Sequence, residues 1–462
     1  MDKVKKSLNS FFKIEERGST ITKELLGGLT IFLAMVYILP VNAGILSTGT
    51  GLTFGSVFAA TAIAAGVASI LMGLLANYPI ALASGMGVNA FFTYTVVLTL
   101  GFSAYEALAA TFISGVLFLI ISLTGLRKTV INAIPKNLKL AIGAGIGFFI
   151  AFIGLKNGGI IVDHGVTFVT LGDLSHPTVL LALFGILLGF GFMAYNKKIT
   201  SFAIILSIVI TGLVGVLLGL IFPSLADVMP GLTNENAGSI SDMGDVFGKA
   251  ITSIPDLLSK PMAYAVIFTF LFIDFFDTSG TLVAVGHDAN LFDANGELIN
   301  GEKALVADAT GTIVGSIFGT STVTSFIESS TGIKQGARTG LSATVVGVLF
   351  LLSLLIYPAF GFVGDVNGLS PVTAVALVYV GALMISSLKE IDWNDHVIVP
   401  VTFITVMIML LAYSIHDGIA FGFIFYTLMM LIAGRKKELN LTIYILAALF
   451  VINYFIYFVI IL

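Results

Sequence analysis

Two carboxylates stand three residues apart in a strongly apolar stretch of this 462-residue chain. Asp274 and Asp277 lie in TFLFIDFFDTSGTL, and on a helix two residues at this spacing share one face. A carboxylate at the centre of a bilayer costs about 2.5–3.5 kcal/mol on insertion scales, and two such groups also repel each other. Because acids in such places are functional by default, the pair predicts a site for a proton or for a ligand with N–H donors. The alternative is that hydroxyls such as Thr278 and Thr281 satisfy both acids without any ligand.

Two other polar residues stand near the starts of short helical segments. In SFIESSTGI, Glu328 lies where orphan N–H groups and the helix dipole favour a negative charge. In SGMGVNAFF, Asn89 occupies the corresponding early turn, and its amide can both donate and accept hydrogen bonds. Gly85 and Gly87, just before it, would let the backbone approach a ligand closely. The alternatives are a simple helix-terminal carboxylate for Glu328 and an ordinary core amide for Asn89.

Together these residues predict one site in which hydrogen-bond acceptors dominate and aromatic rings could stack on a ligand. With 38 Phe in the chain, any single ring is more often in the core or facing lipid than at a site. The further residues expected to line the site are Gly85, Gly87, Phe91, Phe275, Thr278, Thr324, Ser325 and Phe326.

The sequence also argues against several kinds of site. The chain has no cysteine, which excludes disulfides, thiolate metal sites and cysteine nucleophiles. Its histidines fall in or beside expected loops without a helical pair at metal-ligand spacing, and no P-loop is present. An intramembrane hydrolase built on the Asp pair would need a water-polarising partner, and none is evident. We therefore expect no metal, no cofactor and no enzymatic reaction.

The composition indicates which solvent surrounds these residues. The chain is 57% hydrophobic and only 10% charged, against about 25% charged in ordinary soluble domains. Apolar stretches of membrane-spanning length recur from end to end, so we expect an all-α polytopic membrane protein. The fourteen expected spans lie near 24–46, 55–76, 80–99, 104–124, 138–155, 178–195, 200–222, 263–286, 304–319, 321–335, 340–357, 371–387, 397–414 and 417–434. The stretch 441–461 is expected to be an extra span or a peripheral helix.

The basic residues support this count. With a cytoplasmic N-terminus, all but three of the 22 Lys and Arg fall in inside loops, and the exceptions are Lys156, Lys249 and Lys260. This bias is what the positive-inside rule predicts. One miscounted span would invert every later loop, so the agreement favours fourteen spans up to residue 434.

A polar insert at 223–262 divides the chain into two halves of seven spans, 24–222 and 263–434. Residues 1–23 precede them as a cytoplasmic segment, and 435–462 follow as a basic loop and an apolar helix. An odd number of spans in each half forces the halves into opposite orientations, and such inverted repeats are common in transporters.

The third and tenth spans are expected to be part strand and part helix. NYPIALAS (77–84) contains a proline, and TSTVTS (320–325) is polar and β-branched, so neither favours a helix. Irregular backbone at membrane depth is tolerated only where protein or a water-filled cavity satisfies it. We expect the two pieces to meet near the midplane; the alternative is that both are loops at the membrane interface.

At this level of detail the chain resembles the AzgA-like guanine/hypoxanthine permeases of the nucleobase:cation symporter-2 family. The motifs that carry the resemblance are GGLTIFLAMVYILPVN, GMGVNAFFTY, INAIPKNLKLAIGAGIG, DFFDTSGTL and GTSTVTSFIESSTGIKQGARTG. The resemblance implies fourteen segments arranged as a core and a gate domain. It implies purine binding by Asn89, Asp274 and Glu328, and proton coupling by Asp277. The familiar proline before GMG is replaced here by Ser84, which affects the expected local backbone.

The function implied is import of hypoxanthine or guanine by proton symport across the cytoplasmic membrane. Asp274 would accept from the six-membered-ring N–H of these purines, whereas adenine has an acceptor there. The alternative is a permease of the same fold for adenine, xanthine or uracil. An inorganic anion is disfavoured because the site supplies no basic residue, and a passive channel is the remaining alternative. The expected partners are the purine, the proton and the lipid bilayer, with a homodimer as a further expectation and no nucleic acid.

Overall fold

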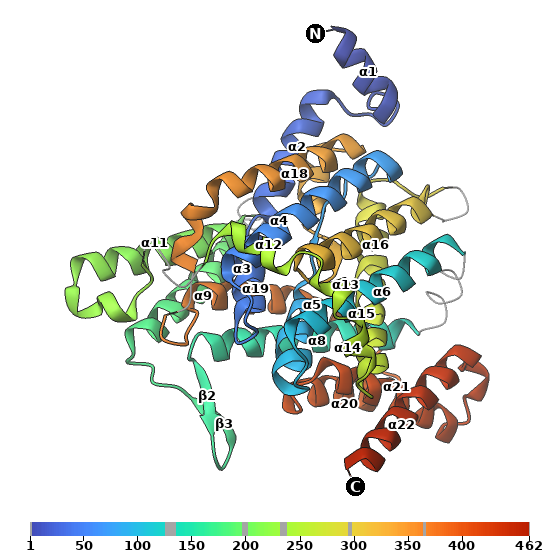
Figure 1. The fold of residues 1–462 in the computed structure, drawn as a ribbon. Coiled ribbons are helices and arrows are strands. Elements are labelled where there is room, and N and C mark those ends of the chain that lie inside the picture. The colour runs from blue at the N-terminus through green and yellow to red at the C-terminus, as the bar shows by residue number, and fades with distance from the viewer. Residues whose placement is uncertain are drawn as a thin grey trace.

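The computed structural model describes residues 2–124, 135–195, 202–231, 238–293, 298–363 and 366–461, and most of them are helical (Figure 1). The helices of the first half are α1 (Asp2–Phe12), α2 (Ile21–Met35), α3 (Ile38–Ser47), α4 (Phe54–Leu71), α5 (Met86–Ala90), α6 (Ala104–Leu123), α8 (Lys136–Asn157), α9 (Pro177–Tyr195) and α11 (Ala203–Ile221). Those of the second half are α15 (Ala263–Asp288), α16 (Gly301–Phe318), α17 (Ser329–Lys334), α18 (Gly340–Leu352), α19 (Pro371–Met384), α20 (Ile398–Leu411), α21 (Ile415–Ile432) and α22 (Leu441–Ile461).

Each of the fourteen predicted spans coincides with a helix or with a strand that leads into a helix. Within the described ranges, ten helices are long and apolar enough to cross a membrane. The helix at Met86–Thr99, which is α5 continued by a π-helical stretch, and α20 are apolar but shorter. The insert at 223–262 forms short helical turns at Pro223–Val228 and Ile240–Asp242, followed by α12 (Met243–Val246), α13 (Lys249–Thr252) and α14 (Ile254–Leu258).

Both broken segments have the predicted strand-then-helix form, and they pair with each other. Strand β1 (Leu82–Ser84) leads into α5, and β4 (Val323–Ser325) precedes α17. The two fully buried strands run antiparallel, with the central residue Ala83 opposite Thr324. Backbone groups beyond the ladder are also satisfied: Gly85 N–H donates to Thr322 C=O, and Phe326 N–H donates to Ala81 C=O, both at 3.0 Å. Non-helical backbone therefore persists here because protein satisfies its hydrogen bonds.

The prediction of an all-α chain is wrong in one place outside these segments. Residues Ile161–His164 and Phe168–Leu171 form an exposed antiparallel hairpin, β2–β3, between α8 and α9. Figure 1 shows it projecting from the end of the molecule opposite α1. The stretch has β-branched and aromatic residues around a glycine turn, but its short length hid that pattern in a chain dominated by apolar helices.

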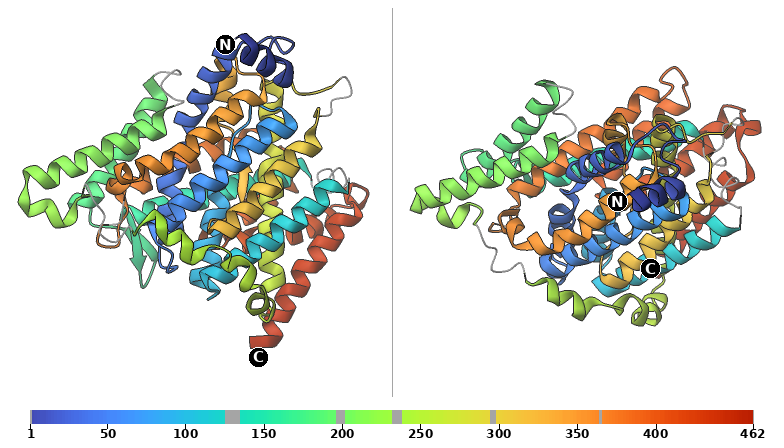
Figure 2. Two further views of the ribbon diagram at one scale, coloured as in Figure 1. Left: turned by 45° about the horizontal axis from the view of Figure 1, so that its top comes forward. Right: turned by 90° about the horizontal axis from the view of Figure 1, so that it is seen from above.

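The long helices pack mainly within two groups. In one group α16 packs against α4 and α6, α18 packs against α2 and α4, and α15 packs against α6. In the other group α8 packs against α19 and α20, α20 packs against α21, and α9 packs against α11 and α19. The views in Figures 1 and 2 place α9 and α11 together on one flank. Contacts between the groups are fewer, and α5 supplies one of them through α8.

Small residues bring helices close together inside each group. A Cβ added to Gly147 of α8 would lie 2.9 Å from the carbonyl oxygen of Gly381 in α19. In the other group, a Cβ on Gly347 of α18 would lie 2.5 Å from the carbonyl oxygen of Gly66 in α4. Close backbone packing of this kind replaces the hydrophobic effect between helices surrounded by lipid.

The segment before α2 ties together the outer ends of the two broken segments. Asn77, which has a left-handed backbone conformation (φ +57°), precedes β1. Its side-chain N–H donates to Phe12 C=O at 2.8 Å, and its amide oxygen accepts from Gly340 N–H at 2.7 Å. Buried Glu24 accepts from Arg338 N–H at 2.8 Å. These bonds hold the chain just before β1 beside the chain that follows α17.

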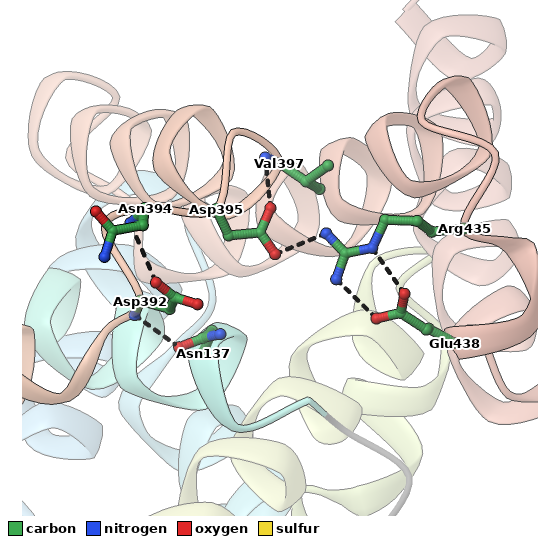
Figure 3. Close-up of polar contacts among 7 residues, drawn as sticks. All are labelled: Asn137, Asp392, Asn394, Asp395, Val397, Arg435 and Glu438. Atoms are coloured by element: carbon green, nitrogen blue, oxygen red, sulfur yellow. Dashed lines mark hydrogen bonds and ion pairs between the residues drawn. The ribbon is translucent and has the colours of Figure 1, made fainter.

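The C-terminal apolar stretch forms helix α22, which lies against α21. The ring of Phe450 contacts those of Phe423 in α21 and Phe268 in α15, with centroids 5.8 and 6.0 Å apart. At the base of α22, the Arg435 guanidinium joins Asp395 to Glu438, at 2.6 and 2.7 Å (Figure 3). This ion-pair cluster connects the start of α20 to the loop before α22.

Candidate functional site

The two acids of α15 contact different neighbours. Asp274 is fully buried, and its Oδ2 accepts from the Thr312 hydroxyl of α16 at 3.0 Å. Its Oδ1 is buried and has no hydrogen-bond partner among the described residues. Asp277 is half-buried, and its carboxylate accepts a hydrogen bond from the Thr324 side chain of β4. One acid therefore keeps a free acceptor in the interior, while the other is more open and contacts the strand.

A third buried acid, Asp308 of α16, joins this pair and was missed in the sequence. It is fully buried, and its Oδ1 accepts from the Thr278 hydroxyl at 2.8 Å and lies 3.5 Å from the Ser325 hydroxyl. Asp274 and Asp308 are close enough for their charges to interact. The signal was present, since Asp308 lies inside the predicted span 304–319, and the rule applied to Asp274 would have identified it.

A short chain of hydroxyls connects two of these acids. The hydroxyl oxygens of Thr324 and Thr278 lie 2.8 Å apart. The Thr324 hydroxyl also contacts Asp277, and the Thr278 hydroxyl contacts Asp308. Three polar contacts thus run along the series Asp277, Thr324, Thr278 and Asp308. With both acids ionised, the two hydroxyl protons point at the acids and none is left for the contact between the two threonines. A proton on either acid would complete all three hydrogen bonds.

Asn89 lies in α5, one turn after Gly85, and is fully buried. Its amide oxygen accepts from the hydroxyls of Ser84, at 2.8 Å, and of Ser321. Its amide nitrogen is buried and has no hydrogen-bond partner in the part of the chain that the structure describes. The side chain therefore has a satisfied acceptor and an unsatisfied donor.

Glu328 immediately precedes α17, and its side chain makes no capping hydrogen bond to that helix. Its carboxylate is half-buried and accepts from the phenol of Tyr37, between α2 and α3, at 2.9 Å. Its charge is near enough to Asp277 for the two to repel. The two half-buried acids therefore come from different elements and share one region.

Some of the residues expected to line the site lie beside the acids. Thr278, Thr324 and Ser325 contact Asp277 or Asp308. A Cβ added to Gly85 would lie 2.9 Å from the Thr324 methyl and 3.8 Å from Asp277 Oδ2, so this glycine does permit a close approach.

The other predicted lining residues also pack against neighbouring helices, and their contact with a ligand stays a prediction. A Cβ on Gly87 would lie 2.7 Å from Ile146 of α8, so Gly87 permits helix packing between α5 and α8. The Phe275 ring packs against Phe118 of α6, with centroids 5.3 Å apart. Phe91 packs against Phe270 at 4.9 Å, and Phe326 is buried in the same large apolar cluster.

The arrangement suits a polar ligand that presents both donors and acceptors. Among the described residues, no group of three His, Asp or Glu side chains could hold a metal ion. Leaving a buried polar atom unpaired costs roughly 1–3 kcal/mol. Asp274 Oδ1 and Asp308 Oδ2 are unpaired acceptors, and Asn89 Nδ2 is an unpaired donor. Three such groups in one buried region indicate hydrogen bonds that a ligand or a proton completes.

Comparison with known proteins gives one family and a consistent set of relatives. The family model described as "Permease family" matches residues 22–421. The guanine/hypoxanthine permease PbuG of Bacillus subtilis is 42% identical over 461 residues, covering 97% of this chain and all of that protein. The adenine permease AdeQ of Escherichia coli is 39% identical over 448 residues, covering 97% and 96%. Among solved structures, the transmembrane domain of the cyanobacterial bicarbonate transporter BicA matches with a TM-score of 0.61 at 15% identity, covering 86% of this chain and 96% of that one, which shows a shared fold.

Proposed function

The chain belongs to this permease family and is a multi-pass membrane transporter, not an enzyme, and we propose that it imports hypoxanthine and guanine by proton symport. The main observation behind this proposal is that two buried groups have no hydrogen-bond partner among the described residues: an acceptor oxygen on Asp274 and the donor NH2 on Asn89. Oxopurines present a ring N–H and several ring or carbonyl acceptors, so one molecule can complete both. Glu328 adds a charged acceptor for another N–H.

The preference among purines depends on whether the ligand has an N–H group to donate to Asp274. Hypoxanthine and guanine carry N–H in the six-membered ring, where adenine carries a bare nitrogen. An ionised acid at that position favours the first two and repels the third. The second candidate is an adenine permease of the same fold. It is supported by the relatives, because a protein named as an adenine permease matches this chain at 39% identity, close to the 42% of one named as a guanine/hypoxanthine permease.

Proton coupling is assigned to the chain that runs from Asp277 to Asp308. Asp277 is the more exposed acid and can exchange a proton with water, whereas Asp308 is fully buried. When Asp277 is protonated, it can donate to Thr324, Thr324 to Thr278, and Thr278 to Asp308. A shift of each of these three protons along its own hydrogen bond leaves Asp277 ionised, Asp308 protonated and both hydroxyls neutral. Asp274 stands beside both acids, so its ionisation and its ligand influence where that proton resides.

Transport is proposed to occur by movement of one helix group against the other. The group that contains α4, α6, α15, α16 and α18 carries the broken segments and the acids, and corresponds to the core. The group of α8, α9, α11, α19, α20 and α21 corresponds to the gate. The antiparallel pairing of β1 with β4 supports two inverted repeats and fourteen spans, with the N-terminus on the cytoplasmic side of the plasma membrane.

The test is binding and gradient-driven uptake of labelled hypoxanthine measured side by side in proteoliposomes. The wild type should concentrate hypoxanthine under an inward proton gradient, and unlabelled guanine should compete better than adenine, xanthine or uracil. Asp274→Asn should lose binding. Asp277→Asn should bind purine and exchange it across the membrane but should not accumulate it.

Three outcomes would change the proposal. Stronger competition by adenine would favour the second candidate. Loss of binding in Asp277→Asn with loss of coupling alone in Asp274→Asn would exchange the roles of the two acids. Normal accumulation by both variants would contradict the proposed site.

A further inference from the structure

A buried series of polar side chains leads from α3 to the amide of Asn89. It begins at Asn42, whose amide N–H groups donate to the hydroxyls of Thr61, at 2.7 Å, and Thr320, at 2.8 Å. The Thr61 hydroxyl in turn donates to the carbonyl of Val57 at 2.7 Å. Asn42, Thr61 and Thr320 are all fully buried, so water does not compete for these bonds.

The direction of these bonds continues to Asn89. The Thr320 hydroxyl accepts from Asn42 and lies 3.3 Å from the hydroxyls of both Thr61 and Ser84, so its own proton can turn to Ser84. The Ser84 proton then goes to Asn89 Oδ1 at 2.8 Å, and Ser321 donates to the same oxygen. Two hydroxyls from separate halves of the chain therefore converge on one side of the Asn89 amide.

We propose that Ser84 and Ser321 are positioning residues that fix the Asn89 amide with its NH2 group as the donor offered to the ligand. An amide can flip, but a flipped Asn89 would need both serine hydroxyls to turn their protons away and accept from its NH2, which reverses the donor direction observed at Ser84 and Ser321. The fixed orientation gives the site a specificity rule: its ligand must present a bare ring nitrogen as an acceptor to Asn89. This inference rests on the proposed purine transport and adds which hydrogen-bond role Asn89 has.

The rule can be tested on the ligand, because deaza purines keep the shape of the ring system and lose one acceptor. In 3-deazahypoxanthine and 7-deazahypoxanthine a C–H group replaces one ring nitrogen. If Asn89 donates to that nitrogen, the analogue loses a hydrogen bond and leaves the buried NH2 unpaired. Loss of one such bond corresponds to roughly tenfold weaker binding.

The experiment compares hypoxanthine with both deaza analogues as competitors of labelled hypoxanthine binding to the purified full chain. We expect the wild type to disfavour at least one analogue by about tenfold. Ser84→Ala frees the amide to rotate, so hypoxanthine should bind several-fold more weakly and the preference over that analogue should shrink toward parity. Ser84→Thr keeps the hydroxyl and should restore the preference.

Ser69→Ala is the matched control for a structural role. Ser69 is a buried serine that also contacts β1, but among the described residues its hydroxyl bonds the N–H and C=O of Leu82 alone, at 2.9 and 3.0 Å. Its removal should leave the ratio of hypoxanthine to deaza analogue unchanged. Ser321→Ala is the second positioning variant and should reduce the ratio in the same direction as Ser84→Ala, which keeps the test informative if one variant does not fold.

The outcomes separate this inference from the proposed function. If the wild type binds hypoxanthine and both deaza analogues equally, the function stands and the donor role of Asn89 is wrong. The inference is also overturned if the alanine variants weaken all ligands alike and keep the wild-type ratio. A wild type that neither binds nor transports any nucleobase would contradict the proposed function itself.

Discussion

The two broken segments are alike in backbone and different in how they present their polar residue. Each has a three-residue buried strand, and the strands pair with one another. The first continues into a helix that reaches Thr99, whereas the second continues into the six-residue α17. Asn89 of the first is fully buried with two hydroxyls on its oxygen, while Glu328 of the second is half-buried with one phenol on its carboxylate.

The difference follows from the chemistry of the two groups. A carboxylate has two equivalent oxygens, so its orientation does not determine whether it donates or accepts. An amide has a donor side and an acceptor side, and it discriminates between ligands only if its orientation is fixed. The neutral residue therefore has the more extensive buried network, and the charged residue stays closer to water, where its desolvation cost is smaller.

The largest effect should come from the charged residue. Glu328→Gln replaces a charge-assisted acceptor by a neutral group, and we expect purine affinity to fall by roughly tenfold to a hundredfold. Isothermal titration of the purified protein measures this change. The matched control is Asp288→Asn, which neutralises an exposed acid at the end of α15 that bonds Ser330, and should bind normally. Unchanged affinity in Glu328→Gln would mean that the second segment does not contact the ligand.

A second variant tests whether proton coupling runs through Thr324 of the second broken segment. Thr278→Val removes the hydroxyl between Thr324 of β4 and Asp308, so the chain to Asp277 is interrupted. We expect purine binding to remain within about twofold and gradient-driven accumulation to fall at least tenfold. Thr310→Val, which removes a hydroxyl that donates to the Val306 carbonyl of its own helix, is the control. Normal accumulation by Thr278→Val would show that protons take another route.

A smaller effect is expected from the phenol that contacts Glu328. Tyr37→Phe removes one hydrogen bond to a carboxylate that keeps its charge and its second oxygen. Affinity for hypoxanthine should fall between about twofold and tenfold. The ratio of hypoxanthine to deaza-analogue binding should stay at the wild-type value, because Asn89 and its hydroxyls are untouched. A change in that ratio would show that the two segments do not act independently; Tyr444→Phe on α22 controls for the substitution itself.

The smallest effect is expected at the ion-pair cluster beside α22, which serves as a reference remote from both segments (Figure 3). Arg435 holds the pKa of Asp395 below its ordinary value of about 3.8, chiefly through a hydrogen bond. The stabilisation is therefore complete above that pH and is lost as the pH falls through the lowered pKa. Arg435→Gln should lower the melting temperature by roughly 1–2 °C at pH 7, because ion pairs that water still reaches contribute little.

Two further measurements on Arg435→Gln, the pH dependence of its melting temperature and its affinity for hypoxanthine, test this prediction. The difference in melting temperature between Arg435→Gln and the wild type should shrink as the pH approaches 4 and below. Hypoxanthine affinity should be the same in both proteins. A large loss of affinity would show that the base of α22 is coupled to the binding site.

Local pattern was sufficient for much of the fold. Ten of the predicted spans coincide with helices long and apolar enough to cross a membrane, since an apolar stretch of sufficient length can satisfy its backbone in lipid only as a helix. The sequence also predicted strands within 80–84 and 321–325, because proline and β-branched residues there disfavour a helix. Asn89, Asp274 and Glu328 were identified as candidates because polar side chains are rare and costly in such surroundings.

Tertiary structure alone decided which of these groups meet. Three contacts join residues more than 200 positions apart: the pairing of β1 with β4, the Ser321 hydroxyl on the Asn89 amide, and the Tyr37 phenol on Glu328. The bond from Ser84 to Asn89 is local, but its direction is not contained in a sequence pattern. Gly87 and Phe275, which are predicted to line the site, also pack against Ile146 and Phe118, and these contacts with neighbouring helices are not visible in the sequence pattern. A periodic pattern specifies an element and its polar residues, whereas donors, acceptors and unpaired atoms exist only once the packed elements face each other.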